Sequence, residues 1–349
     1  MSTPSALQHP PSADVSSPSF TVEVTRGDLV ECRHLVHAAL VDARGNLLRS
    51  WGDVESPVFP RSAYKPLMAL MLVETGAADR FRLFQRELAM ACSSHGGEPQ
   101  HVATVAAWLA RLGLTPGHLE CGAELPLHEP TARALLRSGD TPTALHSDCS
   151  GKHTGFLTVA RHLGLEPKGY IHPDHPVQVR VRVLLEELMG LDLTRVPHGV
   201  DGCGFPQYGI APRTLAAAMA RLAAPETLGA ERAQAATRIN QAVAAEPFYI
   251  AGSDRLCTEL ARVTQGRILA KTGAEGVNVA WLPGQGLGMA LKVADGAARA
   301  RSPALLALLR AQGLLSGDEL SALEVHAHPV VRNVVGRPVG LLRVAGVDE

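Results

Sequence analysis

The chain has 349 residues, of which 46% are hydrophobic, 19% charged and 4% aromatic. This composition is typical of a globular protein and excludes a chain that is mainly disordered. Lys and Arg number 33 and Asp and Glu 34, so the formal net charge is -1 and no general positive field exists to attract nucleic acid or anionic lipid. Because no run of about 18 apolar residues and no basic leader with an apolar run is present, we expect no membrane span, no secretory signal and a cytoplasmic location.

The length corresponds to about two average domains or to one large α/β domain. Residues 1–18 are rich in proline and serine, and we expect them to form a disordered tail before a single domain over residues 19–349. Six cysteines, at positions 32, 92, 121, 149, 203 and 257, are too sparse for a disulfide framework. We therefore expect them to be buried thiols, metal ligands or reactive groups.

Strand patterns occur at both ends of the chain. Phe20, Val22 and Val24 alternate with polar residues, and residues 35–41 and 47–51 flank the turn 42–46, which predicts a β-hairpin. Residues 267–282 and 286–293 are rich in β-forming residues and are separated by a turn at 283–286. Residues 302–309 return to helical spacing, and residues 323–344 indicate mixed strand and loop.

The middle of the chain is predicted to be helical, over roughly residues 66–245. Apolar residues recur at helical spacing within 102–112 and 177–188, and alanine-rich stretches follow Arg213 and Leu228. This order predicts an α/β (α+β) fold, in which both chain ends build one central antiparallel sheet around a helical insertion.

Ser62 and Lys65 lie where a proline-rich loop leads into the apolar run 67–73. If a helix begins at Ser62, Lys65 lies one turn later on the same face, within reach of the serine hydroxyl. A serine becomes nucleophilic when a base takes its proton, and a lysine can do this when burial or a nearby cation lowers its pKa. The spacing therefore suggests a nucleophile and its base, although a capping serine followed by an exposed lysine has the same pattern.

A second motif, Lys271-Thr272-Gly273, lies inside the β-rich run 267–282. A strand that carries a lysine, a hydroxyl and a glycine can present a cation and a close backbone to a substrate. The alternative is a solvated lysine at a sheet edge.

These two motifs, with the hairpin and the last helix, resemble the fold of serine β-lactamases and penicillin-binding proteins. Residues 59–66 (FPRSAYKP), 92–98 (CSSHGGE), 149–155 (CSGKHTG) and 200–206 (VDGCGFP) narrow the resemblance. Together they resemble the Rhizobium-type L-asparaginase II family, from about Phe20 to Val344.

This resemblance implies a β-lactamase-like catalytic domain that hydrolyses L-asparagine to L-aspartate and ammonia through an acyl-enzyme on Ser62. Lys65 would take the hydroxyl proton, and Ser94 with Lys271 would relay protons and position water; Ser93 is the alternative to Ser94. The N–H groups of Ser62 and Ala274 would hold the oxyanion. The family also implies a homodimer.

Residues for substrate recognition can be named beside these. Asp201 is the natural acceptor for a substrate ammonium, in agreement with the family, although an Asx turn before Gly202 is the alternative. Arg61 can hold a carboxylate bidentately. Thr272, Gly273 and Ala274 would form the strand edge at the substrate. His153 is a further candidate, against the alternative of a structural histidine.

Cys149, Lys152 and Cys203 bring two thiols and an amine into two loops that contain glycine. Thiolates suit zinc, but the spacing lacks Cys-x-x-Cys, so the residues alone favour buried or reactive thiols. The resemblance implies that these three side chains bind one zinc ion per chain and leave a position for water.

One difference from the lactamase motifs bears on the alternative functions. The Ser-Asp-Asn element of the lactamases is missing, its nearest counterpart being Ser147-Asp148-Cys149, so we do not expect lactam hydrolysis. A hydrolase of the same fold that acts on another amide, peptide or ester stays open, as does a non-catalytic binding protein on this scaffold.

Overall fold

The computed structural model describes residues 16–347, and its first strands open the main sheet. They are β1 (Ser16–Ser17), β2 (Phe20–Arg26), β3 (Leu29–Asp42) and β4 (Leu47–Trp51). The predicted hairpin is confirmed, because β3 pairs antiparallel with β4. Asp42 closes its turn: Oδ1 accepts hydrogen bonds from the N–H groups of Arg44 and Asn46, each at 2.9 Å.

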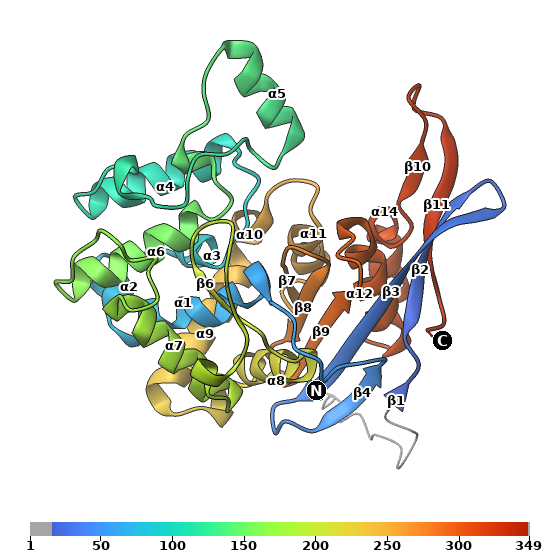
Figure 1. Ribbon diagram of the computed structural model, residues 1–349, viewed down its shortest axis with the longest axis horizontal. Helices are drawn as coiled ribbons and strands as arrows, with labels where there is room; N and C mark the ends of the chain where they lie inside the picture. Colours follow the sequence, from blue (N-terminus) through green and yellow to red (C-terminus); the bar gives the residue numbers. More distant parts are fainter. Residues whose placement is uncertain (1–15, 348–349) are drawn as a thin grey trace, which may run out of the picture.

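Strands from both ends of the chain lie next to one another in this sheet (Figure 1). The C-terminal strands are β7 (Leu269–Thr272), β8 (Val277–Leu282), β9 (Leu287–Val293), β10 (Val330–Arg332) and β11 (Pro338–Ala345). The strand order is β10-β11-β2-β3-β9-β8-β7, with β4 on β3 and β1 on β4. Within the described sheet only the β1–β4 pair is parallel. The predicted mixed fold, with an antiparallel sheet from both chain ends, is therefore confirmed.

The helical insertion lies beside the sheet (Figure 1). Its helices are α1 (Lys65–Glu74), α2 (Ala77–Arg80), α3 (Gln85–Ala91), α4 (Pro99–Arg111), α5 (Glu129–Ser138), α6 (Ser150–His162), α7 (Pro176–Met189), α8 (Pro212–Ala223) and α9 (Ala230–Ala245), with a small hairpin of β5 (His198–Val200) and β6 (Pro206–Tyr208). The helices predicted over 102–112 and 177–188 are confirmed as α4 and α7.

The remaining helices return the chain to the sheet and cover it. They are α10 (Phe248–Ala251), α11 (Leu256–Val263), α12 (Arg301–Ala311), α13 (Gly317–Ala322) and α14 (Glu324–Ala327). Helix α8 packs on β3, β8 and β9, and α12 contacts β2, β9 and β11. All six residues of β8 are buried, so this part of the sheet is covered on both faces.

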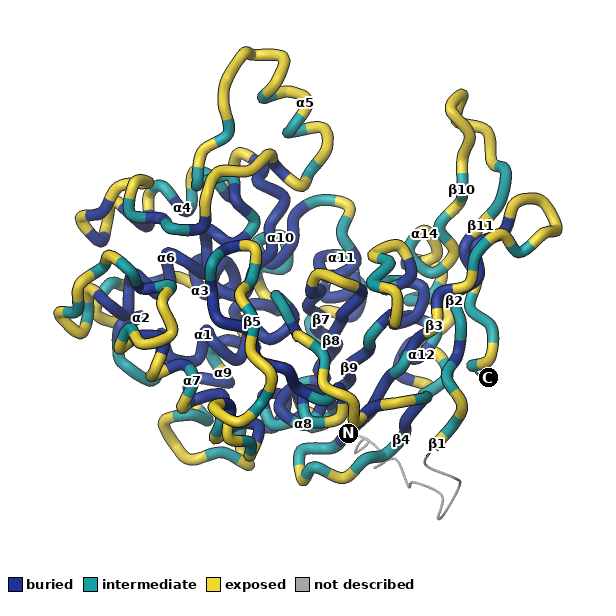
Figure 2. The backbone as a smooth tube through the Cα atoms, in the orientation of Figure 1, coloured by how far each residue is buried: buried dark blue, intermediate teal, exposed yellow. Residues whose placement is uncertain are grey.

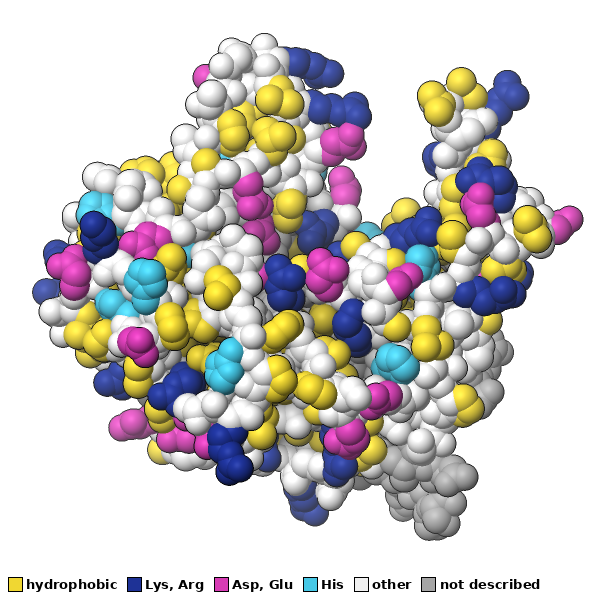
Figure 3. Space-filling view, viewed as in Figure 1, with side chains coloured by type: hydrophobic (Ala, Val, Ile, Leu, Met, Phe, Trp, Pro, Cys, Tyr) yellow, Lys and Arg dark blue, Asp and Glu magenta, His cyan; other side chains and the backbone are white. Residues whose placement is uncertain are grey.

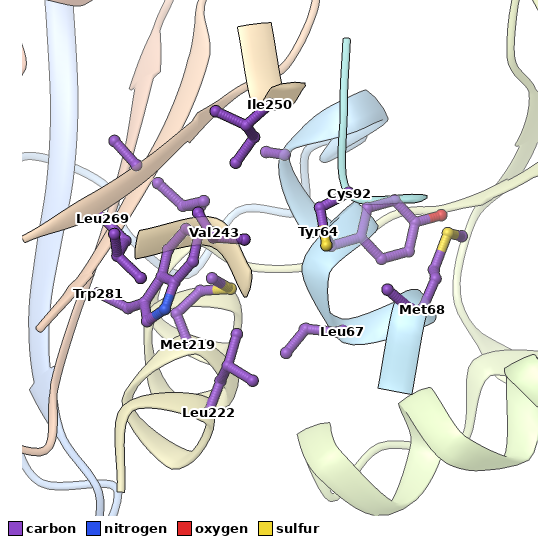
Figure 4. Packing of buried hydrophobic residues seen from close by; sticks show 14 of the residues in the cluster. Tyr64, Leu67, Met68, Cys92, Met219, Leu222, Val243, Ile250, Leu269 and Trp281 are labelled. Atoms are coloured by element: carbon purple, nitrogen blue, oxygen red, sulfur yellow. The ribbon is translucent and has the colours of Figure 1, made fainter. Parts of the chain in front are cut away.

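The core joins the sheet to the helical insertion. Trp281 of β8 lies among Met219, Leu222 and Val243 from α8 and α9 (Figure 4), and its indole N–H donates to Asn240 Oδ1 at 2.9 Å. Nine of the ten residues of α1 are buried, so this helix runs through the interior. Its first residue, Lys65, is therefore held inside the protein.

Helix α5 differs from the rest of the insertion, because it projects from the body and none of its residues is buried (Figures 1 and 2). The segment before it reaches back to the pocket described below.

The predicted tail lies mostly outside the described residues, which begin at position 16. Ser16–Ser17, which the sequence assigned to the tail, form β1 and pair with Ser50 and Trp51. Residues 323–344, predicted as mixed strand and loop, include α14, β10 and β11, and β11 pairs with β2. No helix in the described part of the chain combines the length and apolar character needed to cross a membrane.

Candidate active site

Ser62 lies in a single turn of 3-10 helix, Arg61–Tyr64, that runs directly into α1. Its side chain is half-buried, and its hydroxyl makes no hydrogen bond with the described residues. Arg61 has φ +53°, a left-handed conformation that non-glycine residues rarely adopt and that clusters at functional sites. The N–H of Arg61 donates to Gln207 Oε1 at 3.0 Å, which holds this turn.

The end of β7 packs directly against that turn. A Cβ on Gly273 would lie 2.4 Å from the carbonyl oxygen of Pro60 and 3.2 Å from the N atom of Ala63. Only glycine allows this approach, which brings Thr272 and Ala274 to the pocket beside Ser62. Among the described residues, the N–H groups of Ser62 and Ala274 have no hydrogen-bond acceptor.

Two buried lysines meet at Ser94, which is 5% exposed. Lys65 Nζ lies 3.0 Å from Ser94 Oγ, and Lys271 Nζ lies 3.0 Å from the same atom. Lys65 also donates to the carbonyl of Ser93 at 2.6 Å and contacts Cys149 Sγ at 3.2 Å. Lys271 donates to the carbonyl of Thr272 at 2.5 Å.

These contacts engage Lys65, predicted as the base for Ser62, with other groups. Its three N–H groups have three partners, and Ser62 is not among them. Residues three apart eclipse in a 3-10 turn, so the spacing alone would allow a contact with Ser62. The Lys65 side chain turns instead toward the Ser93–Ser94 segment. Ser94, named above as part of the second pair, is the residue that both lysines contact.

The two lysines differ in their pKa values. Burial alone would lower the pKa of Lys65, but negative charge on the Cys149–Cys203 pair and on Asp148 raises it above the ordinary value. Burial, followed by the positive charge of Lys65, lowers the pKa of Lys271 to about 7. Lys271 is therefore the amine that can be neutral and accept a proton near neutral pH.

The three side chains expected to bind zinc converge below the pocket. Lys152 Nζ lies 3.0 Å from Cys203 Sγ. The Cys149 thiol, at the start of α6, hydrogen-bonds Cys203 and so lowers the pKa of the Cys203 thiol, which Lys152 lowers further. Gly151 permits the close packing of α6, since a Cβ there would lie 2.3 Å from the Met90 carbonyl oxygen.

Two thiols and one amine in contact are a donor set that fits a soft divalent ion, provided that the amine is neutral. No group of three or more His, Cys, Asp or Glu side chains within residues 16–347 is arranged to hold a metal. The set thus depends on Lys152 as its third ligand.

Arg61 and Asp201 form an ion pair at the pocket. Arg61 Nε lies 2.7 Å from Asp201 Oδ1. The carboxylate also accepts hydrogen bonds from the N–H of Gly202 at 2.9 Å and from Gln207 Nε2 at 3.3 Å. Because this backbone contact reaches the next residue and not the one two positions on, the described residues show no Asx turn at Asp201, and its carboxylate lies at the pocket.

His153, predicted to contact substrate, is not among the residues that line the pocket. It is fully buried, its Nδ1 lies 2.6 Å from the Tyr170 hydroxyl, and its ring packs on Phe205. Burial lowers the pKa of this imidazole to about 4, so it stays neutral. This position in the core agrees with the structural alternative for His153.

The pocket that these segments enclose also contains charged residues that no motif indicated. Its lining consists of Arg61, Ser62, Ser94, Glu124, Leu127, Asp148, Cys149, Asp201, Gly202, Cys203, Arg255, Thr272, Gly273, Ala274 and Arg301. Basic and acidic side chains lie together below the space between the α5 segment and the β10–β11 hairpin (Figure 3). Glu124, Arg255 and Arg301 come from separate segments, so only the fold brings them together.

The pocket thus brings together two serines, two buried lysines and an ion pair, a set of groups that can catalyse acyl transfer. The sequence profile of the L-asparaginase II family matches residues 22–344. The chain therefore belongs to the L-asparaginase II family.

Solved structures are similar at low sequence identity. A β-lactamase, Mb2281c, from Mycobacterium bovis is 19% identical, with a TM-score of 0.41, and the match covers 80% of this chain and 95% of that chain. A LovD6 mutant of simvastatin synthase from Aspergillus terreus is 11% identical, with a TM-score of 0.32 and coverage of 74% and 84%. No curated protein sequence matches the chain.

Proposed function

We propose that this protein hydrolyses the side-chain amide of L-asparagine, giving L-aspartate and ammonia through an acyl-enzyme on Ser62. The observation that carries the proposal is the position of the Ser94 hydroxyl, 3.0 Å from both lysine amines and at the same pocket as Ser62. Family membership supports amide hydrolysis in general, and the ion pair of Arg61 and Asp201 supports an amino acid as substrate.

Ser62 is better placed than Ser94 to act as the nucleophile. Its hydroxyl is half-buried at the pocket and free of hydrogen bonds among the described residues, whereas Ser94 is almost completely buried. Ser62 also lies at the start of a helical segment, where unpaired N–H groups favour negative charge. Its own N–H and that of Ala274 would hold the oxyanion of the tetrahedral intermediate.

The proton of the Ser62 hydroxyl is transferred through the Ser94–Lys271 pair. As Ser62 Oγ attacks the amide carbon, its proton passes to Ser94 Oγ while the Ser94 proton moves to neutral Lys271. When the intermediate collapses, the carbon–nitrogen bond breaks and the leaving nitrogen takes a proton back along the same route. Water then attacks the ester, activated by the same pair, and L-aspartate leaves. Charged Lys65 orients Ser94 and keeps Lys271 neutral.

The positive charge of the substrate's α-ammonium would be bound by Asp201, whose carboxylate would accept hydrogen bonds from it. Arg61 would orient this carboxylate through its Nε atom, which lies 2.7 Å from Asp201 Oδ1. Thr272 and Gly273 would present the strand edge to the substrate, as the sequence predicts.

Cys149, Lys152 and Cys203 would hold one zinc ion per chain. When bound, this ion would supply positive charge at the pocket wall and strengthen substrate binding. The proton route above does not pass through it. A homodimer of single catalytic domains, over residues 19–349, and a cytoplasmic location are also parts of this proposal, and light scattering tests the dimer.

Ammonia release from L-asparagine and L-glutamine, measured beside the colour change on ring opening of a chromogenic lactam, tests the function. We expect release from L-asparagine, loss of it in Ser62→Ala, and no lactam hydrolysis. Hydrolysis of only the lactam would favour another hydrolase of this fold, and no turnover of any amide would favour a binding protein.

A further inference from the structure

Arg255 is a basic residue of the pocket that neither a motif nor the mechanism above uses. It is the residue before α11, and its side chain is half-buried. Within residues 16–347 its guanidinium makes no hydrogen bond or ion pair, although it lines the pocket with Ser62 and Ser94. A guanidinium at the pocket with five N–H donors and no acceptor from the described protein can bind a ligand that supplies acceptors.

The segment that carries Arg255 is held in place by the chain's own contacts. Ser253 donates to Glu98 twice, from its N–H and from its hydroxyl, each at 2.8 Å. Gly252 has φ +102°, and a Cβ there would lie 2.4 Å from Glu98 Oε1. The N–H of Ser94 donates to the carbonyl of Ile250 at 3.1 Å. Arg255 is therefore presented on a rigid segment fixed to the one that carries Ser94.

The other two arginines of the pocket are already engaged. Arg61 is compensated by Asp201 at 2.7 Å. Arg301 donates to the carbonyls of Gly273 and Ala298, so it supports the β7 end. Arg255 lies near enough to Lys271 and Arg301 for its charge to lower the pKa of both groups. The guanidinium of Arg255 therefore adds to the positive charge on this side of a pocket that Glu124, Asp148 and Asp201 also line, and it can attract an anion there.

We propose that Arg255 binds the α-carboxylate of the amino acid substrate, and is thereby a specificity residue for carboxylate-bearing amides. This assignment rests on the proposed function. It supplies the positive charge that the Arg61–Asp201 pair, being neutral overall, does not provide. The ammonium is bound at Asp201 and the carboxylate at Arg255, so two separate segments of the chain recognise the two charged groups of a free amino acid.

The test compares Arg255→Gln with the wild type on three amides, and uses Arg262→Gln, an exposed substitution on the same helix, as the control. L-Asparagine has both charged groups, succinamic acid lacks the amine, and β-alaninamide lacks the carboxylate. Assays at about pH 8.5 keep Lys271 neutral in both proteins. Calorimetric titration with L-aspartate measures binding without turnover.

Arg255→Gln should raise the KM for L-asparagine and succinamic acid on the order of 10- to 100-fold, with a smaller change in kcat. Its kcat/KM for β-alaninamide should equal that of the wild type, and Arg262→Gln should match the wild type throughout. An unchanged KM for L-asparagine, or an equal loss on β-alaninamide, would overturn the assignment.

Failure of the proposed function would give a different result in these assays from failure of the Arg255 assignment. A wild type that releases no ammonia from L-asparagine would refute that function. The titration with L-aspartate then decides on Arg255 alone: weaker binding by Arg255→Gln supports the carboxylate site, and equal or absent binding overturns it.

Discussion

The approach of Gly273 to the Ser62 turn gives a prediction whose size follows from the structure. In Gly273→Ala the new Cβ would meet the Pro60 carbonyl oxygen at 2.4 Å, whereas ordinary contact begins at about 3.4 Å. Backbone atoms on both sides cannot rotate away, so the end of β7 must move by roughly 1 Å relative to Ser62. This displacement separates the two N–H groups proposed for the oxyanion.

We expect a fall in kcat of about 100-fold, because a displacement of about 1 Å at reacting groups has this effect. Overpacking of this kind costs about 1–3 kcal/mol of stability, so the melting temperature should also fall by a few degrees. Steady-state ammonia release gives kcat and KM, and calorimetry gives the melting temperature.

Gly317→Ala is the matched control, since a Cβ there meets no atom within 4 Å and the residue has no left-handed φ. It should retain wild-type activity and stability. If Gly273→Ala had wild-type kcat in a folded protein, the close packing of β7 on the Ser62 turn would not build the site.

Two further predictions concern protonation and metal. If neutral Lys271 is the base, activity should rise with pH through about 7 and then level off, and activity that falls between about pH 7 and 9 would exclude it. The wild type should contain about one zinc per chain by elemental analysis, and less zinc after acidification. The Cys203→Ser variant should lose the zinc and show a raised KM with a smaller change in kcat. A metal-free Cys203→Ser protein with wild-type KM would contradict a role of the zinc in substrate recognition.

Much of the fold could be predicted because its signals are local. The turn between β3 and β4 and the helical spacing within α4 and α7 depend on neighbours in the chain. The position of β11 beside β2 could not be predicted in this way, because it pairs residues that lie more than 300 positions apart, such as Leu342 with Val24.

The site residues also divide into those that the sequence predicts and those that only the fold brings together. Arg61, Ser62, Ser94, Asp201 and the end of β7 lie at one pocket, as their motifs suggest. The partner of Lys65 could not be predicted from spacing, because it depends on how the interior side chain turns toward the Ser93–Ser94 segment. Arg255 has no motif at all, and only the packing of its segment on Glu98 brings it to the pocket.

The central claim is that Ser62 carries the acyl group. The most direct measurement is mass spectrometric peptide mapping of enzyme quenched rapidly with acid during turnover of L-asparagine, because acid protonates Lys271 and stops hydrolysis of the ester. An aspartyl ester on the peptide that contains Ser62, absent from Ser62→Ala, is the predicted result. An ester on Ser94, or ammonia release by Ser62→Ala at the wild-type rate, would contradict it.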